Sequence, residues 1–79
     1  MIEVYSKNNC QQCRMVKNFL ASKGVEFIEI NTSDNQEAIK MLKNLGVKAL
    51  PAVFENNELK FTGFAPTELQ KLRGVSNGN

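Results

Sequence analysis

The chain has 79 residues, 42% of them hydrophobic and 23% charged, which suits one small globular domain and excludes wholesale disorder. Ten Lys and Arg against eight Asp and Glu leave a net charge of +2, which excludes the strongly basic surface of a nucleic-acid-binding domain. Histidine is absent, so imidazole catalysis is excluded, and two cysteines are too few for a disulfide-rich secreted scaffold or a four-ligand zinc site.

No apolar stretch is long enough to span a membrane. The first residues, Met1–Val4, have neither the basic nor the apolar region of a signal peptide. We therefore expect a protein of the reducing cytoplasm. Residues 1–74 are predicted to form a single domain, and residues 75–79, which are rich in Gly, Ser and Asn, a flexible C-terminal tail.

The first half of the chain predicts a strand, a helix and a second strand. Residues 2–5 alternate in polarity, which favours a strand. From Gln11 the apolar residues recur at helical spacing, and Gly24 behind Lys23 predicts the end of that helix. Residues 25–30 predict a second strand near a sheet edge, because its acidic residues interrupt the alternation. The apolar face of the helix is expected to consist of Met15, Val16, Phe19 and Leu20.

A second helix is predicted to begin with a capping box, because Ser33 stands three residues before Gln36. Gly46 is expected to end this helix. Its apolar stripe is expected to consist of Ala38, Ile39, Leu42 and Leu45.

The rest of the chain predicts a hairpin and a short helix. Residues 51–55 and 58–62 favour strands, joined by a two-residue turn at Asn56-Asn57, since Asn tolerates positive φ. Pro66 suits the first turn of a last helix. The order β-α-β-α-β-β-α predicts an α/β fold, in which three helices cover both faces of a four-stranded mixed sheet.

Cys10 and Cys13 form a C-x-x-C motif where the first strand gives way to the helix. Their spacing places both side chains on one helix face, within reach of a disulfide. The unpaired amides and the dipole of the helix start stabilise a thiolate at Cys10, and Lys7 and Arg14 lie nearby in sequence. We predict that Cys10 is the nucleophile of disulfide exchange and that Cys13, one turn further in, is the resolving thiol.

Two other readings of the motif stay open. The cysteines can be idle thiols, or two chains can share a zinc ion or an iron–sulfur cluster through two C-x-x-C pairs. The βαβ context favours the redox motif over both.

Leu50-Pro51 opens the third predicted strand. A proline at the start of a strand can simply mark a strand at the edge of a sheet. In this architecture we instead predict a cis-proline that lies beside the first strand, opposite Cys10. Such a bond exposes a backbone edge on which an extended substrate can pair.

A third feature is the segment of residues 61–66. Gly63 suits a turn and Pro66 suits the start of a helix, so both residues have a purely structural explanation. A turn does not need two large aromatic side chains, and Phe61 and Phe64 therefore call for another one. We expect the aromatic residues around this turn to wall a cleft beside the thiols, but Phe54 and Phe61, which face each other across the hairpin, are expected to belong to the core.

These motifs resemble those of the glutaredoxin-like NrdH redoxins, a branch of the thioredoxin superfamily, over about residues 2–73. The family shows C-V-Q-C or C-M-Q-C, so Gln12 matches and Gln11 differs. In its later motif, W-S-G-F-R-P, this chain has Phe61, Thr62 and Ala65 in place of Trp, Ser and Arg. The resemblance rests on Tyr5-Ser6-Lys7, Cys10-Gln11-Gln12-Cys13, Leu50-Pro51 and Gly63-Phe64-Ala65-Pro66.

The resemblance implies a thioredoxin- or glutaredoxin-like fold. It also implies a dithiol–disulfide oxidoreductase, which we expect to be a monomer without a cofactor or metal. Such proteins take electrons from thioredoxin reductase and pass them to ribonucleotide reductase. The residues predicted to contact substrate or partner are Lys7, Gln11, Gln12, Leu50, Pro51, Gly63 and Phe64.

The alternative within redox chemistry is a glutathione-dependent glutaredoxin. That family shows C-P-Y-C, T-V-P and a Gly-Gly-x-Asp-Asp start to the last helix. Here Phe64 replaces the second glycine, and Pro66 and Thr67 stand where the acidic pair would be. A non-catalytic binding module and an iron–sulfur cluster carrier are further alternatives.

Overall fold

The computed structural model describes residues 1–72 and confirms the predicted element order. The tail predicted for residues 75–79, like the end of the predicted domain at 73 and 74, lies outside the described residues. The elements are β1 (Ile2–Ser6), α1 (Gln11–Ser22), β2 (Phe27–Asn31), α2 (Gln36–Asn44), β3 (Ala52–Glu55), β4 (Glu58–Thr62) and α3 (Pro66–Gln70).

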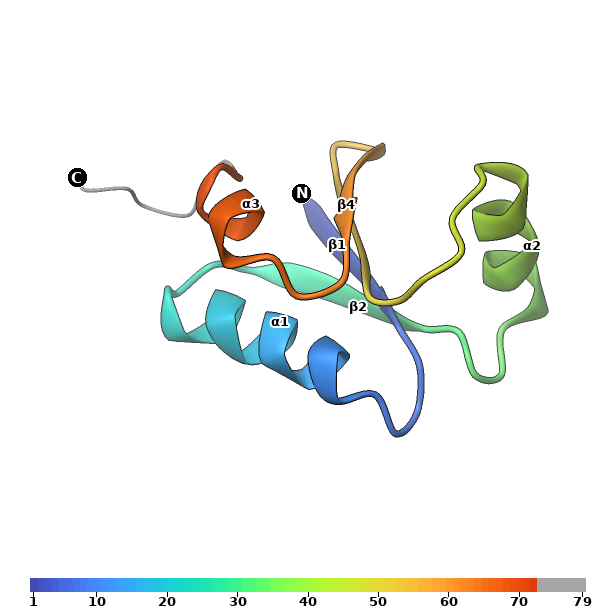
Figure 1. Ribbon diagram of the computed structural model, residues 1–79, viewed down its shortest axis with the longest axis horizontal. Coiled ribbons are helices and arrows are strands. Elements are labelled where there is room, and N and C mark those ends of the chain that lie inside the picture. The colour runs from blue at the N-terminus through green and yellow to red at the C-terminus, as the bar shows by residue number, and fades with distance from the viewer. Residues whose placement is uncertain (73–79) are drawn as a thin grey trace.

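The four strands form one mixed sheet in the order β2-β1-β3-β4 (Figure 1). β1 pairs in parallel with β2 and antiparallel with β3, and β3 pairs antiparallel with β4. At the centre, Val4 lies between Glu29 of β2 and Val53 of β3. The prediction that the second strand lies at an edge is confirmed. The parallel β1–α1–β2 unit places the start of α1 at the carboxyl end of β1.

The helices cover both faces of the sheet, as predicted. α1 and α3 lie together on one face, and α2 covers the other (Figure 1). On the α2 face Tyr5 packs edge-on against Phe54, with ring centroids 5.1 Å apart. The first core cluster, beneath α1 and α3, is Ile2, Val4, Val16, Leu20, Val53, Leu69 and Leu72. The second, beneath α2, is Leu42, Ala52 and Phe54.

The end of α1 explains why β2 is shorter than the predicted strand. Gly24, with φ +70°, donates its N–H to the carbonyl of Ala21, and Val25 donates to the carbonyl of Leu20. These two bonds form a Schellman motif, which satisfies carbonyls that the helix leaves unpaired. Val25 therefore belongs to the helix end, and β2 begins only at Phe27. α2 ends in the same way at Gly46.

The predicted capping box of α2 is wrong. Asn35 caps the helix, and its Oδ1 accepts a hydrogen bond from the N–H of Ala38 at 3.0 Å. Asn and Ser are about equally good in this position. Ser33 is engaged elsewhere, because its hydroxyl oxygen accepts the N–H of Asn8 at 2.8 Å.

Two residues predicted for the apolar helix faces are instead exposed. Met15 lies on the solvent side of α1, where the buried face is formed by Cys13, Val16 and Leu20. Leu45 is 54% exposed because it forms the C-cap of α2, beyond the last helical residue. The spacing of hydrophobic residues thus predicted the positions of both helices correctly, but it predicted a wider buried face than either helix has.

The hairpin turn is confirmed. Asn56 and Asn57 have φ values of 53° and 68°, the left-handed conformation that a two-residue hairpin turn of this kind requires at both positions. The N-terminal amine of Met1 donates to Oδ1 of Asn56 at 2.8 Å, which ties the start of β1 to the turn.

A polar contact holds α1 to the strands beneath it. Oε2 of Glu29 accepts hydrogen bonds from the hydroxyl of Ser6 at 2.7 Å and from Nζ of Lys17 at 2.8 Å. These three side chains come from β2, β1 and α1. The bonds from Lys17 and Ser6 lower the pKa of Glu29 because they favour its charged form.

This contact predicts an acid-sensitive contribution to stability. A carboxylate whose pKa is lower in the folded than in the unfolded chain stabilises the fold above the unfolded pKa, and that contribution is lost as the pH falls through the folded pKa. We expect Glu29→Gln to lower the free energy of unfolding by about 1 kcal/mol at pH 7. Below the folded-state pKa the variant and the parent should be equally stable.

Urea unfolding followed by circular dichroism from pH 7 down to pH 3 measures this difference directly. A difference that stays constant over that whole range would show that the charge of Glu29 contributes nothing.

Candidate active site

Cys10 and Cys13 form a disulfide at the amino end of α1, with their Cα atoms 5.2 Å apart. Cys10 is the N-cap residue, in extended conformation, and its Sγ accepts a hydrogen bond from the backbone N–H of Cys13 at 3.1 Å. The helix thus directs one of its unpaired amides at the sulfur of Cys10, as expected from the sequence. In the reduced protein the same N–H would stabilise a thiolate there.

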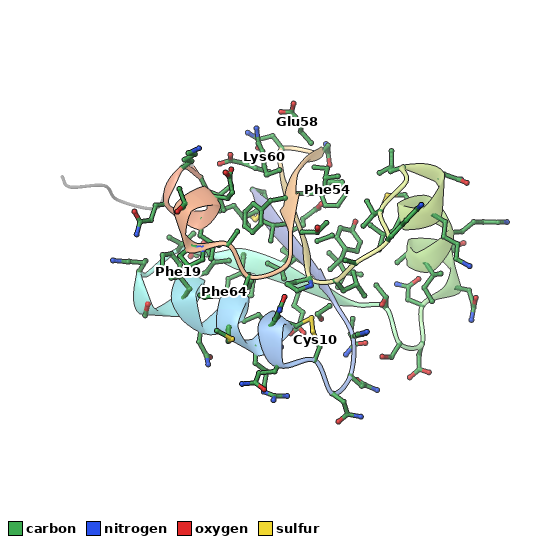
Figure 2. All side chains as sticks on the ribbon, viewed as in Figure 1. Cys10, Phe19, Phe54, Glu58, Lys60 and Phe64 are labelled. Atoms are coloured by element: carbon green, nitrogen blue, oxygen red, sulfur yellow. A yellow bond between two sulfur atoms is a disulfide. The ribbon has the colours of Figure 1, made fainter. Side chains whose placement is uncertain are left out.

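The two sulfurs differ in exposure. Cys10 is 9% exposed and Cys13 is 1% exposed. Cys10 lies near the start of α1, in the lower part of the view (Figure 2). Cys10 therefore keeps a small exposed surface through which an exchange partner would approach, while Cys13 is covered by the rest of the protein.

A hydrogen-bonded network that the sequence analysis missed supports the loop in front of Cys10. Asn8 donates its backbone N–H to Ser33 and accepts at Oδ1 from Nδ2 of Asn31 at 2.9 Å. Thr32 donates both its backbone N–H, at 2.7 Å, and its hydroxyl, at 2.9 Å, to the carbonyl of Ser6.

The network could have been anticipated from topology. β1 and β2 are parallel, so the polar residues that follow each of them meet at the same edge of the sheet. The loops after the two strands consequently fix the approach of the chain to Cys10.

The Leu50–Pro51 peptide bond is cis, as predicted. β1 and β3 pair Tyr5 with Ala52, so one further step along the register sets Pro51 level with Ser6, at the end of β1. Pro51 is fully buried, and its carbonyl accepts the N–H of Gly63 at 2.8 Å. This bond joins the start of β3 to the loop that leads into α3.

Gln12 connects that loop to the C-x-x-C turn. Its Oε1 accepts the backbone N–H of Phe64 at 3.2 Å. Gly63 has φ +79°, and a Cβ at this position would lie 3.3 Å from the same oxygen. Glycine is therefore favoured by both conformation and space. The structure thus brings together four of the predicted residues, Gln12, Pro51, Gly63 and Phe64.

Leu50 is bonded to Pro51 and packs against the second core cluster, whereas the other two predicted residues are not tied into this assembly. The side chains of Lys7 and Gln11 are exposed and make no hydrogen bond or ion pair with any residue of the described chain, and the same holds for Arg14. The rings of Phe61 and Phe64 are half-buried and pack against the first core cluster. In Figure 2 the Phe64 ring lies between the α3 loop and α1. The core position predicted for Phe61 is therefore confirmed, and Phe64 contributes to the same core.

Within residues 1–72, no three His, Cys, Asp or Glu side chains are grouped so that they could hold a metal ion. No helix of this part of the chain is both long and apolar enough to cross a membrane.

Comparisons with known proteins agree with this geometry. Residues 2–60 match the glutaredoxin family model. The glutaredoxin-like protein NrdH of Lactococcus lactis is 43% identical over 72 residues, which cover 91% of this chain and 99% of that protein. The NrdH protein of Escherichia coli is 32% identical over 71 residues, covering 90% of this chain and 86% of that protein.

Solved structures extend the likeness to three dimensions. The NrdH-redoxin of Escherichia coli, described by its thioredoxin-like activity profile, superposes with a TM-score of 0.84 at 30% identity, covering 91% of this chain and 93% of that one. Glutaredoxin 1 of Francisella tularensis, at 22% identity and a TM-score of 0.69, shares the fold over 87% of this chain and 86% of its own. The chain belongs to the glutaredoxin family, and within it to the NrdH-like thiol–disulfide redoxins, with Cys10–Cys13 as its redox-active disulfide.

Proposed function

We propose that this redoxin carries electrons in the cytoplasm from thioredoxin reductase to a protein disulfide, with ribonucleotide reductase as the acceptor. The observation that carries the proposal is the asymmetric cysteine pair, in which Cys10 keeps 9% of its surface exposed and is hydrogen-bonded by a helix amide, while Cys13 is 1% exposed. The likeness to NrdH proteins supports the choice of donor and acceptor.

The chemistry takes two exchange steps. The Cys10 thiolate attacks one sulfur of the target disulfide, which forms a mixed disulfide and releases the other target sulfur as a thiolate that takes up a proton. Cys13 then loses its proton and attacks Cys10, which forms the Cys10–Cys13 bond and releases the second target thiol. Two electrons pass to the target, and the reductase returns the redoxin to its dithiol form by the reverse exchanges.

The surroundings of Cys10 supply the docking surface for these steps. Gln12, Gly63 and Phe64 form a hydrogen-bonded rim on one side of the C-x-x-C turn, and Pro51 joins that rim to the sheet. We assign contacts with the partner to this rim and to three outlying residues, Lys7, Gln11 and Leu50.

Glutathione is a poorer candidate for the electron source. A charged tripeptide needs paired polar groups in its site, and without them its desolvation opposes binding. The loop after Gly63 continues with Phe64, Ala65, Pro66 and Thr67, which offers no acidic pair for an ammonium group. The next residue in the sequence, Glu68, is acidic, but its carboxylate is paired with the Lys71 ammonium group at 3.5 Å.

A coupled assay tests the proposal. The oxidised protein is supplied with NADPH and a bacterial thioredoxin reductase in one arm, and with NADPH, glutathione and glutathione reductase in the other. We expect rapid NADPH oxidation in the first arm, at least tenfold faster than in the second, with insulin as terminal disulfide. Cys10→Ser provides the blank for both arms. Efficient turnover with glutathione, combined with none from several bacterial thioredoxin reductases, would favour a glutathione-dependent glutaredoxin.

A further inference from the structure

A small apolar groove lies between α2 and the segment that leads into β3. Its volume is about 150 Å³. The floor is formed by aliphatic side chains of α2 and of residues 47–50, so the groove opens beside the segment that carries the cis-proline. A wider hollow of about 450 Å³ adjoins it along α2 and shares Ile39 and Lys43 with it. The apolar residues that line the groove are Ile39, Leu42, Val47, Ala49 and Leu50.

The rim of the groove and of the adjoining hollow is basic. Lys40, Lys43 and Lys48 are all exposed there, and none of them forms an ion pair with another residue of the described chain. Glu37 is the one acid among the residues that line the two depressions. By contrast, Lys17, Lys60 and Lys71 are each paired with a glutamate. Three unpaired lysines thus surround this apolar floor, while Lys7, Arg14 and Lys23 are the unpaired basic residues elsewhere in residues 1–72.

The groove is continuous with the active site. Leu50, part of its lining, is bonded directly to Pro51, whose carbonyl is held by Gly63. A target chain that presents its disulfide to Cys10 passes the Leu50–Pro51 segment if it pairs with the backbone edge there. Each further residue of an extended chain advances about 3.3 Å, so a few residues beyond the cysteine extend along the groove.

We propose that this groove binds the stretch of the target protein that flanks its disulfide, and that it selects stretches containing aliphatic and acidic residues. The aliphatic side chain fills the floor, and carboxylates face the lysines of the rim. The proposal rests on the proposed function, because it assumes that Cys10 attacks a protein disulfide. It adds a substrate class, since charge complementarity favours one flanking sequence over another.

Single-turnover reduction of synthetic disulfide peptides tests the groove. Three peptides share one scaffold and one disulfide, and the flanking segment carries Leu with two Glu, two Gln or two Lys. The reduced protein is mixed with each peptide at low salt and at 0.3 M salt. We expect the Glu peptide to react about threefold to tenfold faster than the Gln peptide at low salt, with the Lys peptide slowest, and the preference to shrink at high salt.

A pair of matched variants separates the groove from overall charge. In Lys43→Gln/Lys48→Gln the ratio of the Glu-peptide rate to the Gln-peptide rate should fall close to one. Lys60→Gln/Lys71→Gln removes the same charge elsewhere; Lys60 lies at the far end of the hairpin from Cys10 (Figure 2). This control should keep the full preference.

The outcomes are distinguishable. If the parent protein reduces all peptides at equal rates, or if both double variants lose the preference equally, the groove has no such role. If the parent forms a dimer that Lys43→Gln/Lys48→Gln abolishes, the groove is occupied by a second copy and the proposal is wrong. If the reduced parent protein reduces no peptide and no bis(2-hydroxyethyl) disulfide either, the proposed function itself has failed.

Discussion

Cys10→Ser is expected to abolish disulfide reduction, whereas Cys13→Ser is expected to stop the reaction halfway. A serine hydroxyl is not ionised near neutral pH and cannot replace the thiolate as nucleophile. In Cys13→Ser the attacking sulfur remains, and Cys10, the less buried of the two cysteines, can still form the mixed disulfide. Because the Cys13 thiol is missing, nothing attacks the mixed disulfide between Cys10 and the target. The protein therefore stays covalently bound to its target.

Non-reducing gels and intact mass spectrometry detect the trapped adduct. Alkylation of the reduced parent protein with iodoacetamide at about pH 6 gives an independent readout, because only a stabilised thiolate reacts well there. We expect the label on Cys10, which receives the N–H of Cys13. Faster labelling of Cys13, or a trapped adduct in Cys10→Ser instead of Cys13→Ser, would reverse the assignment.

Leu69→Ala is expected to cause a large loss of stability. Leu69 is completely buried in the first core cluster, and α3 has only five residues, so the helix has little stability of its own. Truncating a buried leucine costs about 2–5 kcal/mol, a large part of the total for a domain of this size. The Gly63–Phe64 rim precedes α3 directly, so loosening of the helix should also slow disulfide reduction.

Leu45→Ala is the matched control. The same atoms are removed from a side chain that is 54% exposed, so the change in free energy of unfolding should stay within about 0.5 kcal/mol. Urea unfolding of the two variants with the parent gives the comparison. Equal losses in both would mean that the packing of α3 is not what Leu69 contributes.

Much of the fold was predictable because local signals agreed with one another. The helix-ending glycines, the two asparagines of the hairpin turn and Pro66 at the start of α3 each lie where their backbone preferences require. Hydrophobic spacing located α1 and α2 for the same reason. The antiparallel pairing of β3 with β4 was predictable from the two-residue turn that joins them.

The errors arose where tertiary contacts choose between equivalent local options. Ser33 and Asn35 are both good caps, and only the contact of Ser33 with Asn8 decides that Asn35 has this role. Met15 fits the helical spacing, but the position of α1 on the sheet turns it to solvent. Sequence spacing carries no information about such choices.

The chemistry of the active site was predictable from the sequence, but the hydrogen bonds that hold the surrounding loops in place were not. The spacing of Cys10 and Cys13 and the start of the helix were enough to predict the disulfide, which the structure contains. The bond from Phe64 to Gln12 joins residues 52 positions apart, so no local pattern could reveal it. The network of Asn8 and Asn31 is of the same kind, because it depends on the parallel pairing of β1 and β2.

The central claim is that the protein is a dithiol carrier of two electrons. The most direct test compares, in a single turnover, the amount of peptide disulfide reduced with the amount of protein oxidised. The fully reduced protein is mixed with one equivalent of a disulfide peptide, quenched by alkylation and analysed by intact mass spectrometry. We expect one peptide disulfide to be reduced to two thiols for each protein molecule converted to the intramolecular Cys10–Cys13 disulfide. Protein that remains fully reduced, or that accumulates as a stable mixed disulfide or a disulfide-linked dimer, would contradict the account.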